Sequence, residues 1–317
     1  MPVLLADAKN FTQDKLTQFI IDEFRKDLLM ELMIFDDTVI PIGETLAYVY
    51  NRVTTLPSAA FRALNTEYAP HEAKTTQYTA VLKQLGGSFQ VDRVIQKHVK
   101  GITDQITFQL SQKITATKAL FADTFINGDT ASNANSFDGL NKALVGSSTE
   151  TNTDTVIDLS SSANITANAH VFMDALDKML SELNGEITAI AVNQKLKAII
   201  NGIARRSGYF STSDVDAFGK PVTKYAGIPF VEVGYKPGTA LPIIGVDGTA
   251  GTTDLYALRI ALDGVHAISP SGSTVVNAYL PNMQAPGAVK TGEVEMVTAM
   301  ALKATRAAGV MRKIKIA

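Results

Sequence analysis

One helical pattern, over residues 91–127, constrains the fold of this chain more than any other feature. No proline lies between Asp92 and Asn127, and Gly101 alone weakens the run, by about 1 kcal/mol relative to alanine. A helix of this length measures about 50 Å, about two to three times the average. Because the apolar stripe is mostly one-sided, we expect the helix to lie along a sheet and to end at Asn127–Gly128. The stripe consists of Val91, Ile95, Val99, Ile102, Ile106, Leu110, Ile114, Phe121 and Phe125.

A second amphipathic pattern precedes Pro41, and Thr12 is placed to cap a helix there. Pro41 ends the helical option. Two interpretations stay open: a helix packed on the core of this chain, or an arm that buries its stripe on a partner. The stripe consists of Leu16, Phe19, Ile20, Phe24, Leu28 and Leu32.

The segment from residue 41 to residue 90 has few large apolar residues and many Pro and Gly residues. Thr75–Leu85 alternates loosely and is rich in β-formers, which predicts a strand. The Gly86–Gly87 pair predicts a tight turn into a second strand at Ser88–Val91. Such a loop and hairpin has no core of its own, so we expect a neighbouring molecule to stabilise it.

Beyond residue 144 the pattern is mixed, which predicts an α+β protein. A polar stretch over 145–167 precedes a helix at 171–183, a strand at Ile187–Val192 and a helix at 196–206. Strands follow, and two pairs of them flank turn dipeptides that predict hairpins, Ala226–Gly227 and Asp263–Gly264. Residues 292–304 and 310–316 close the chain as two more strands.

Residues with catalytic or metal-binding chemistry are scarce. The chain has no cysteine, which excludes disulfides, thiolate metal sites and cysteine nucleophiles. Four histidines are present, no two of them at the spacing of a helical zinc site: His71, His98, His170 and His266. Neither a serine-hydrolase elbow nor a phosphate loop occurs, and GVDGTAG at 245–251 is interpreted as a turn. We therefore assign no catalytic, cofactor-binding or metal-binding residue and do not expect an enzyme.

The charge balance argues against a sequence-reading nucleic-acid module, because the formal net charge is −2. Basic residues gather near the C-terminus at Arg306, Arg312, Lys313 and Lys315. We interpret them as belonging to an edge strand protected by lysine, with weak, sequence-independent contact with nucleic acid as the alternative. No apolar run reaches the length of about 18 residues that a membrane helix needs, and no signal peptide is recognisable.

Three segments carry a family resemblance. Residues 49–95 contain TTLPSAAFRALNTEY and KTTQYTAVLKQLGGSFQVDRVI, and residues 218–233 read FGKPVTKYAGIPFVEV. Between them, a Phe-x-Asn-Gly helix end is followed by a polar spacer and Phe-Asp-Gly-Leu. These motif residues are Phe125, Asn127, Gly128, Phe137, Asp138, Gly139 and Leu140. In this order the three segments resemble the major capsid proteins of tailed bacteriophages, which have the Hong Kong 97-type fold.

The resemblance implies an α+β Hong Kong 97-type architecture with four parts. Residues 1–40 would form an N-terminal arm, and 41–90 an extended loop, a β-hairpin that lies on an adjacent subunit. Residues 91–144 and 260–317 would form a peripheral domain with the long spine helix. Residues 145–259 would form an axial α/β domain, whose loops meet at the centre of each pentamer or hexamer.

The function implied is self-assembly through pentamers and hexamers into the icosahedral head that encloses phage double-stranded DNA. The expected location is the virion, after assembly in the bacterial host cytoplasm. Expected partners are other copies of the chain, a portal protein, a separate scaffolding protein and, weakly, the packaged DNA, with no membrane. The alternatives are an encapsulin-type shell around a protein cargo, a minor structural protein of a tail or head, and an α/β enzyme without a linear motif.

Overall fold

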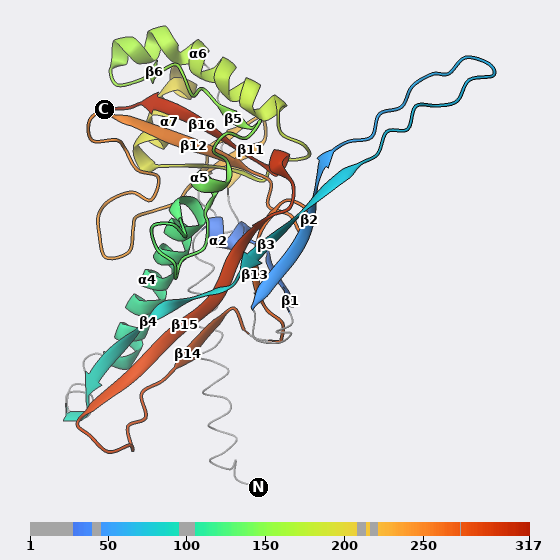
Figure 1. Cartoon of the computed structure of the whole chain (residues 1–317). Coiled ribbons are helices and arrows are strands. Elements are labelled where there is room, and N and C mark those ends of the chain that lie inside the picture. Colours follow the sequence, from blue (N-terminus) through green and yellow to red (C-terminus); the bar gives the residue numbers. More distant parts are fainter. Residues whose placement is uncertain (1–27, 40–45, 95–104, 208–213, 216–220, 273) are drawn as a thin grey trace.

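A computed structural model describes residues 28–39, 46–94, 105–207, 214–215, 221–272 and 274–317. Figure 1 shows an elongated molecule with two β-sheets, one beyond the other along its length, and a two-stranded hairpin that projects away from both. Helices and strands are mixed along the chain, which confirms the predicted α+β class.

The first sheet is built around its longest strand, β15 (Val289–Leu302). The first ten residues of β15 pair antiparallel with β4 (Lys83–Asp92). β14 (Val276–Tyr279) pairs with part of the same stretch. The end of β15 pairs antiparallel with β13 (Val265–Pro270). On its other side, β13 pairs in parallel with β1 (Phe35–Val39). Alternate residues of β15 are buried in its first half, so this half of the sheet has one covered and one open face.

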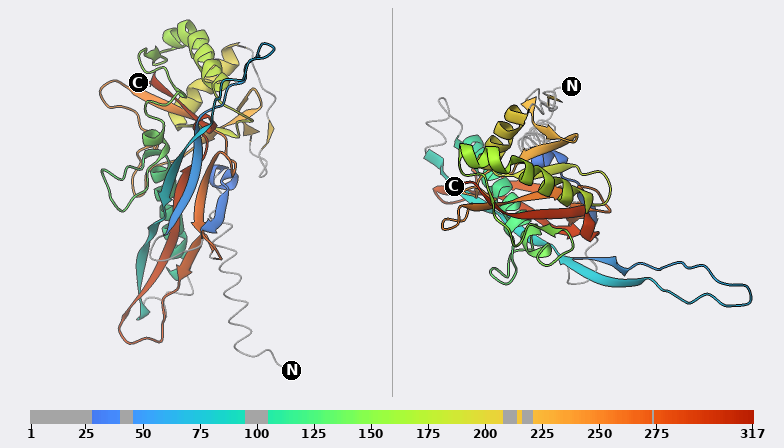
Figure 2. Two further views of the ribbon diagram at one scale, coloured as in Figure 1. Left: turned by 45° about the vertical axis from the view of Figure 1, so that its right-hand side comes forward. Right: turned by 90° about the horizontal axis from the view of Figure 1, so that it is seen from above.

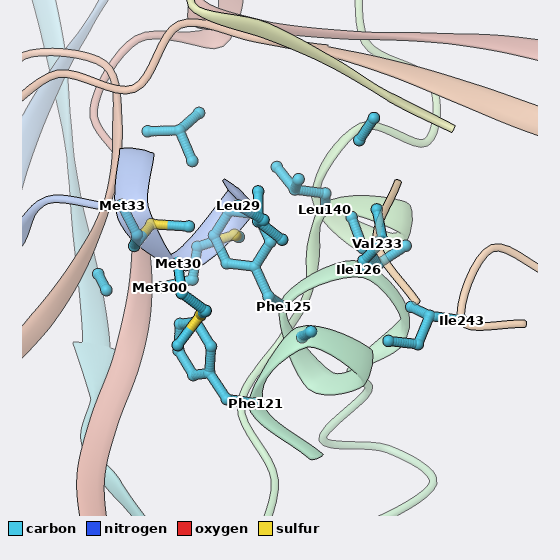
Figure 3. Close-up of a cluster of buried hydrophobic side chains, with 14 of the residues drawn as sticks. Leu29, Met30, Met33, Phe121, Phe125, Ile126, Leu140, Val233, Ile243 and Met300 are labelled. Atoms are coloured by element: carbon cyan, nitrogen blue, oxygen red, sulfur yellow. The ribbon is translucent and has the colours of Figure 1, made fainter. Parts of the chain in front are cut away.

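The long helix α4 (Gln105–Asn127) covers that face and packs against β4 and β15. This confirms both the position predicted for the helix along a sheet and its end at Asn127. Residues 95–104 of the predicted helix lie outside the described residues. Figure 3 shows Phe125 of α4 beside Leu29 and Met30 of α2 (Leu28–Leu32), and Phe121 beside Met300 of β15, within the first core.

The second sheet lies between two cores. In the central strand β12 (Thr252–Leu258), residues 255 and 257 face the core under helices α6 (Ser162–Ser181) and α7 (Gln194–Ser207). Residues 256 and 258 face the core that contains α4. A strand buried on both faces must be apolar throughout, which the four residues of β7 illustrate. The strands in order are β10 (Lys224–Tyr225), β11 (Ile228–Glu232), β7 (Ala189–Val192), β12 (Thr252–Leu258), β16 (Ala308–Lys315) and β5 (Glu150–Thr151), with β6 (Ile157–Asp158) also on β16.

The structure confirms several local predictions. The helices expected at 171–183 and 196–206 are α6 and α7, and the strand between them is β7. However, α6 begins at Ser162, inside the polar stretch 145–167 that the sequence predicts to be a loop or domain boundary. The β10–β11 hairpin turns at Ala226 and Gly227, with φ values of 49° and 83°, as a two-residue hairpin loop requires. The remaining elements are β2 (Ala47–Thr55), β3 (Lys74–Val81), α5 (Leu140–Ala143), β5, β6, the short pair β8 (Asp214–Val215) and β9 (Pro221–Val222), and the 3₁₀ turn η1 (Thr305–Ala307).

The predicted turn at Gly86–Gly87 is wrong, because β4 runs straight through both glycines. A Cβ atom on Gly86 would lie 2.0 Å from the Val294 carbonyl oxygen of β15. On Gly87 it would lie 3.0 Å from the Lys113 side chain of α4. The pair therefore allows β4 to approach its neighbours closely and does not reverse the chain.

The hairpin predicted around Asp263–Gly264 is also wrong, because its two strands belong to different sheets. β12 pairs with β7 and β16, whereas β13 pairs with β1 and β15. The tight link is real, since the Val265 N–H donates to the Arg259 carbonyl and the Arg259 guanidinium pairs with Asp263 at 2.8 Å. It carries the chain from one sheet to the other.

Two further expectations change at the chain ends. Helix α2 ends at Leu32, and residues 35–39, which the sequence places in a helix before Pro41, form β1. Pairing with β13 and burial of Asp36 override the local pattern there. Residues 1–27 of the predicted helix lie outside the described residues. β16 is an inner strand between β12 and β5, so the interpretation as an edge strand is wrong.

Candidate assembly surface

The hairpin of β2 and β3 is the largest part of the described chain without a core. The two strands pair antiparallel from Ala47 with Val81 to Thr55 with Lys74. Every residue from 53 to 79 is exposed, and the right-hand view of Figure 2 shows the hairpin leaving the body. Its tip, residues 56–73, carries large apolar side chains in water, among them Phe61 (107% exposed) and Leu64 (91%). An isolated two-stranded hairpin is only marginally stable, and exposed apolar patches mark interaction sites, so this segment is a candidate contact surface.

Stacked aromatic rings join the two strands at the root of the hairpin, and Arg52 ties the root to the body. Tyr50 of β2 stacks on Tyr78 of β3, with ring centroids 5.9 Å apart, and the Arg52 guanidinium lies 4.1 Å from the centre of the Tyr78 ring. Arg52 also donates a hydrogen bond to the Leu302 carbonyl at the end of β15. The Leu82 N–H donates to the Leu46 carbonyl and closes the hairpin. These contacts fix the direction in which the hairpin projects.

A buried histidine lies behind this root. His266 of β13 is fully buried, and its Nε2 atom lies 3.8 Å from the Asp36 carboxylate of β1. The Tyr48 ring meets the imidazole edge-on at 6.1 Å, and the Tyr48 hydroxyl donates to Asp36 at 3.2 Å. Burial, together with the positive charge of Lys303, lowers the pKa of His266 from its ordinary 6.5 despite Asp36. The neutral imidazole is therefore the form that the fold favours.

The two glycine motifs noted in the sequence meet at the end of α4. The Gly139 N–H donates to the Gly128 carbonyl at 2.8 Å. A Cβ on Gly128 would lie 2.2 Å from the Phe137 carbonyl oxygen, so both motifs need glycine for close backbone contact. Phe125, Phe137 and Leu140 are buried beneath this turn. The two motifs thus hold both ends of the polar spacer together at the end of α4.

The same contact between the ends of the spacer brings two carboxylates close to one lysine. The Lys142 ammonium lies 2.7 Å from Asp129 and 2.9 Å from Asp138. The hydrogen bond from Lys142, helped by the Ala131 N–H and Ser132, lowers the pKa of Asp129 to about 2. For Asp138, burial opposes ionisation, but hydrogen bonds from Lys142 and Thr130 outweigh it and lower the pKa. All three groups are charged at neutral pH.

A groove runs between the hairpin root and this charged cluster. Its volume is about 580 Å³. Aromatic and aliphatic residues form its floor: Tyr50, Tyr78, Ala80, Phe137, Ala299, Met300 and Leu302. Its charged residues are Arg52, Lys83, Asp138 and Lys142. An apolar floor with a charged border suits a protein segment better than a small polar metabolite.

Sequence reasoning did not single out this groove, because its walls come from three separate stretches of the chain. The alternation of tyrosines at 48, 50 and 78 was the one available signal, since facing residues on a hairpin share a side. The basic C-terminal residues are placed elsewhere. Arg312 is mostly buried and pairs with Glu150 at 2.8 Å and Asp254 at 2.7 Å, and Lys315 lies 3.6 Å from Asp158.

The histidines are dispersed over the described residues. His71 is exposed in the hairpin tip, His170 is exposed on α6, and His98 lies outside the described residues. Residues 245–251 form a loop before β12, in which Asp247 accepts the Thr249 and Ala250 N–H groups. Within the described ranges, no three His, Cys, Asp or Glu side chains are placed to hold a metal ion. Among the helices of the same ranges, none is long and apolar enough to cross a bilayer.

Solved structures of shell proteins have the same fold. One is the encapsulin of the holo-SrpI complex from Synechococcus elongatus PCC 7942, with 16% identity, a TM-score of 0.62 and coverage of 90% of this chain and 87% of that chain. A protein of Mycobacterium phage Bobi has 13% identity and a TM-score of 0.56, covering 88% and 91%. The capsid of a native GTA particle has 10% identity and a TM-score of 0.55, covering 86% of each.

Sequence comparison adds nothing to these likenesses. No family model matches this chain, and no curated protein matches it either. At identities of 10% to 16%, the likeness is one of fold. It spans nearly the whole of each chain, so it concerns the arrangement of both sheets and the long helix together.

Proposed function

We propose, from the premise that this chain has the Hong Kong 97-type fold of capsid and encapsulin shell proteins, that it is the major capsid protein of a tailed bacteriophage. It assembles through pentamers and hexamers into an icosahedral head that encloses double-stranded DNA. The observation that carries this proposal is the hairpin, whose residues 53–79 are all exposed. A chain that extends an apolar tip into water is built to place it on another molecule.

The physical basis of assembly is many modest contacts. A projecting hairpin that lies on a different surface of the next copy makes a heterologous contact, and such contacts close into rings and shells when the rotation permits. Each copy both donates and receives a hairpin. Because the contacts are linked, the shell is held far more tightly than any single contact would allow.

The domain division stays part of this proposal. We assign residues 1–40 to an arm, 41–90 to the extended loop, 91–144 and 260–317 to the peripheral domain, and 145–259 to the axial domain. Two pairings favour adjusting its borders. β4 pairs with β15, which associates residues 83–92 with the peripheral sheet, and β16 pairs with β12, which associates residues 308–315 with the axial sheet.

The proposed location is the virion, after assembly in the host cytoplasm, with a portal protein and a separate scaffolding protein as partners. Contact with packaged DNA would be weak and spread over many copies, because the net charge is −2. The pairing of Arg312 and Lys315 with carboxylates of the same chain supports this view. Their charge is compensated within the fold.

The test replaces residues 56–73 by Asn-Gly, which can join the paired residues Thr55 and Lys74 by a two-residue turn. We expect a soluble chain that unfolds at the same temperature as the full-length chain but forms no shells by electron microscopy. The full-length chain, purified and assembled in parallel, is the control. Normal shells from the chain without its tip would contradict the proposal.

An encapsulin-type compartment is the second candidate, favoured by the higher TM-score of the encapsulin than of the phage and GTA capsids. Both candidates predict closed shells, so the contents distinguish them. Particles purified from the natural source should contain double-stranded DNA in the first case. A single enclosed protein and no DNA would favour the second.

A further inference from the structure

The tip of the hairpin carries a helical sequence that the isolated chain does not use. Between Pro57 and Pro70 lies SAAFRALNTEYA, in which Ser58 suits a helix N-cap and four alanines favour helix. The large apolar residues Phe61, Leu64 and Tyr68 are spaced i, i+3 and i+7, so a helix would bring all three onto one face. The whole segment is bounded by proline at each end, as a short helix would be.

In the structure this segment is irregular apart from one turn. The Thr66 N–H donates to the Ala63 carbonyl at 3.3 Å, and the Arg62 guanidinium donates to the Thr66 carbonyl at 3.0 Å. Asn65, with a φ of 66°, interrupts any continuation. A helix over residues 59–69 would be too short to be stable alone in water, because helices below about 12–15 residues are marginal without tertiary packing. An apolar surface that covers the stripe would remove this limit.

The groove at the hairpin root has the chemistry to cover that stripe. Much of its lining is aromatic and aliphatic, and its charged residues, counting the Asp129 that pairs with Lys142, are three basic and two acidic. The tip, residues 56–73, has the opposite balance, with Glu67 and Glu72 against Arg62. The groove lies along β2 and β3 beside Tyr50, Arg52 and Tyr78, and the strand pairing continues beyond it to Thr55 and Lys74, so the hairpin carries its tip onward and away from its own groove. The occupant must therefore be the tip of a second copy.

We propose that residues 59–69 become a helix when the tip of one copy enters the root groove of the next, with Phe61, Leu64 and Tyr68 facing the groove floor. This inference rests on the proposed function, and it adds a conformational change to the assembly contact. The irregular form keeps the tip soluble before assembly. Helix formation and docking then occur together, which makes each contact cooperative.

Two proline variants test the helix directly. Ala59→Pro lies at the first helical position, where proline is tolerated, whereas Ala63→Pro lies in the interior. We expect Ala63→Pro to raise the critical concentration for particle formation, measured by light scattering, about 100-fold, and Ala59→Pro to change it by less than about threefold. Equal effects of the two prolines, whether large or absent, would overturn the inference.

Substitutions of Asn65 give a test with opposite signs. If the docked tip is helical, Asn65→Ala should lower the critical concentration about threefold and Asn65→Gly should raise it about twofold. If the docked tip keeps the left-handed turn of Asn65, glycine should be the better residue and alanine the worse one. That reversed order, in particles that still form, would overturn the helix alone. Failure of the unmodified chain to assemble under any condition would overturn the proposed function as well.

Discussion

The hairpin and the second sheet are both built of β-strands, yet they are stabilised in opposite ways. β7 and β12 lie between two cores, with their side chains buried on both faces apart from residues at the start of β12. β2 and β3 have almost no buried side chain and form a sheet of only two strands. Contacts within this chain stabilise the first pair, whereas the proposed function assigns the stabilisation of the second pair to a neighbouring copy.

This contrast separates two uses of apolar side chains. Apolar residues of the second sheet contribute to folding, at about 25 cal/mol per Å² of apolar surface removed from water. Apolar residues of the hairpin tip contribute nothing to folding and remain available for binding. Substitutions in the two regions should therefore affect two different measurements, and each prediction below tests this separation.

The largest effect on folding is expected from Phe125→Ala. Phe125 is fully buried in the first core, so its truncation should lower the free energy of unfolding by about 3–5 kcal/mol. Phe61→Ala is the matched change in the tip and should lower it by less than about 0.5 kcal/mol. Urea denaturation of both variants measures the difference.

In assembly the order of the two variants should be reversed, with the larger effect on the critical concentration from Phe61→Ala. We expect Phe61→Ala to raise the critical concentration for particles about 30-fold, as loss of an aromatic anchor does at an interface. Phe125→Ala should assemble from whatever fraction remains folded. A tip variant that unfolds as easily as the core variant would show that the hairpin contributes to the stability of the single chain.

Arg312→Ala should give the next largest loss. The Arg312 side chain is 14% exposed and bonds to Glu150 and Asp254, and also to Asn141 at 2.5 Å. Removing it leaves two poorly solvated carboxylates without a counter-charge, so we expect a loss of about 3 kcal/mol. The exposed Arg306 offers the control, and Arg306→Ala should change stability by less than about 0.5 kcal/mol.

Assembly distinguishes this ion pair from the tip. Arg312 joins β16 to β5, β12 and the segment after α4, all within one chain. Particles of Arg312→Ala should therefore form at the concentration expected from its folded fraction. A larger defect would mean that this charged cluster also faces a neighbouring copy.

Local features of the fold were predictable from the sequence, whereas strand partners were not. The end of α4 at Asn127 and the turn at Ala226–Gly227 depend on neighbouring residues, and both were correctly predicted. The Asp263–Gly264 link looked like a hairpin because the sequence does not say that its strands pair with residues elsewhere in the chain. β16 looked like an edge strand for the same reason, since Arg312 meets its partner Glu150 across 162 positions.

The candidate surface shows the same limit. The scarcity of large apolar residues over 41–90 correctly indicated an exposed segment at residues 53–79, but not the burial of Leu82 and Phe89 in the first core. The groove was not predictable, since it joins the hairpin, the spacer after α4 and the end of β15. Only folding brings those three stretches together.

Acidification should weaken the hairpin root before it affects the second sheet. The pKa of His266 is lowered by burial and by Lys303, so the unfolded chain binds the proton more readily. The stabilising contribution is complete above about pH 6.5 and is lost as the pH falls through the folded-state value. We expect the free energy of unfolding to fall between about pH 7.5 and pH 5. The slope should be shallower in His266→Gln, and an unchanged slope would contradict the assignment.

The smallest expected effect comes from two half-buried aspartates, one beside the groove and one in the second sheet. The pKa of Asp129, near the groove, is lowered to about 2 by Lys142, and that of Asp158, in the second sheet, is lowered to about 2 by Ser160. A lowered carboxyl pKa stabilises the fold above its unfolded value of 3.8, and this stabilisation is lost as the pH falls toward 2. Asp129→Asn and Asp158→Asn should each be less stable than the unmodified chain at neutral pH and should converge with it in acid.

Salt should reduce the difference at Asp129, whose main partner is the Lys142 ammonium, because ionic interactions are screened within about 3 Å at 1 M ionic strength. The difference at Asp158 should be less sensitive to salt, because it depends mainly on hydrogen bonds from Ser160. The two variants should also differ in assembly, since Asp129 holds Lys142 at the border of the groove, whereas Asp158 lies beside Lys315 on β16. Asp129→Asn frees a positive charge toward an acidic tip and should lower the critical concentration slightly. An equal change in Asp158→Asn would show that net charge, and not the groove, controls the contact.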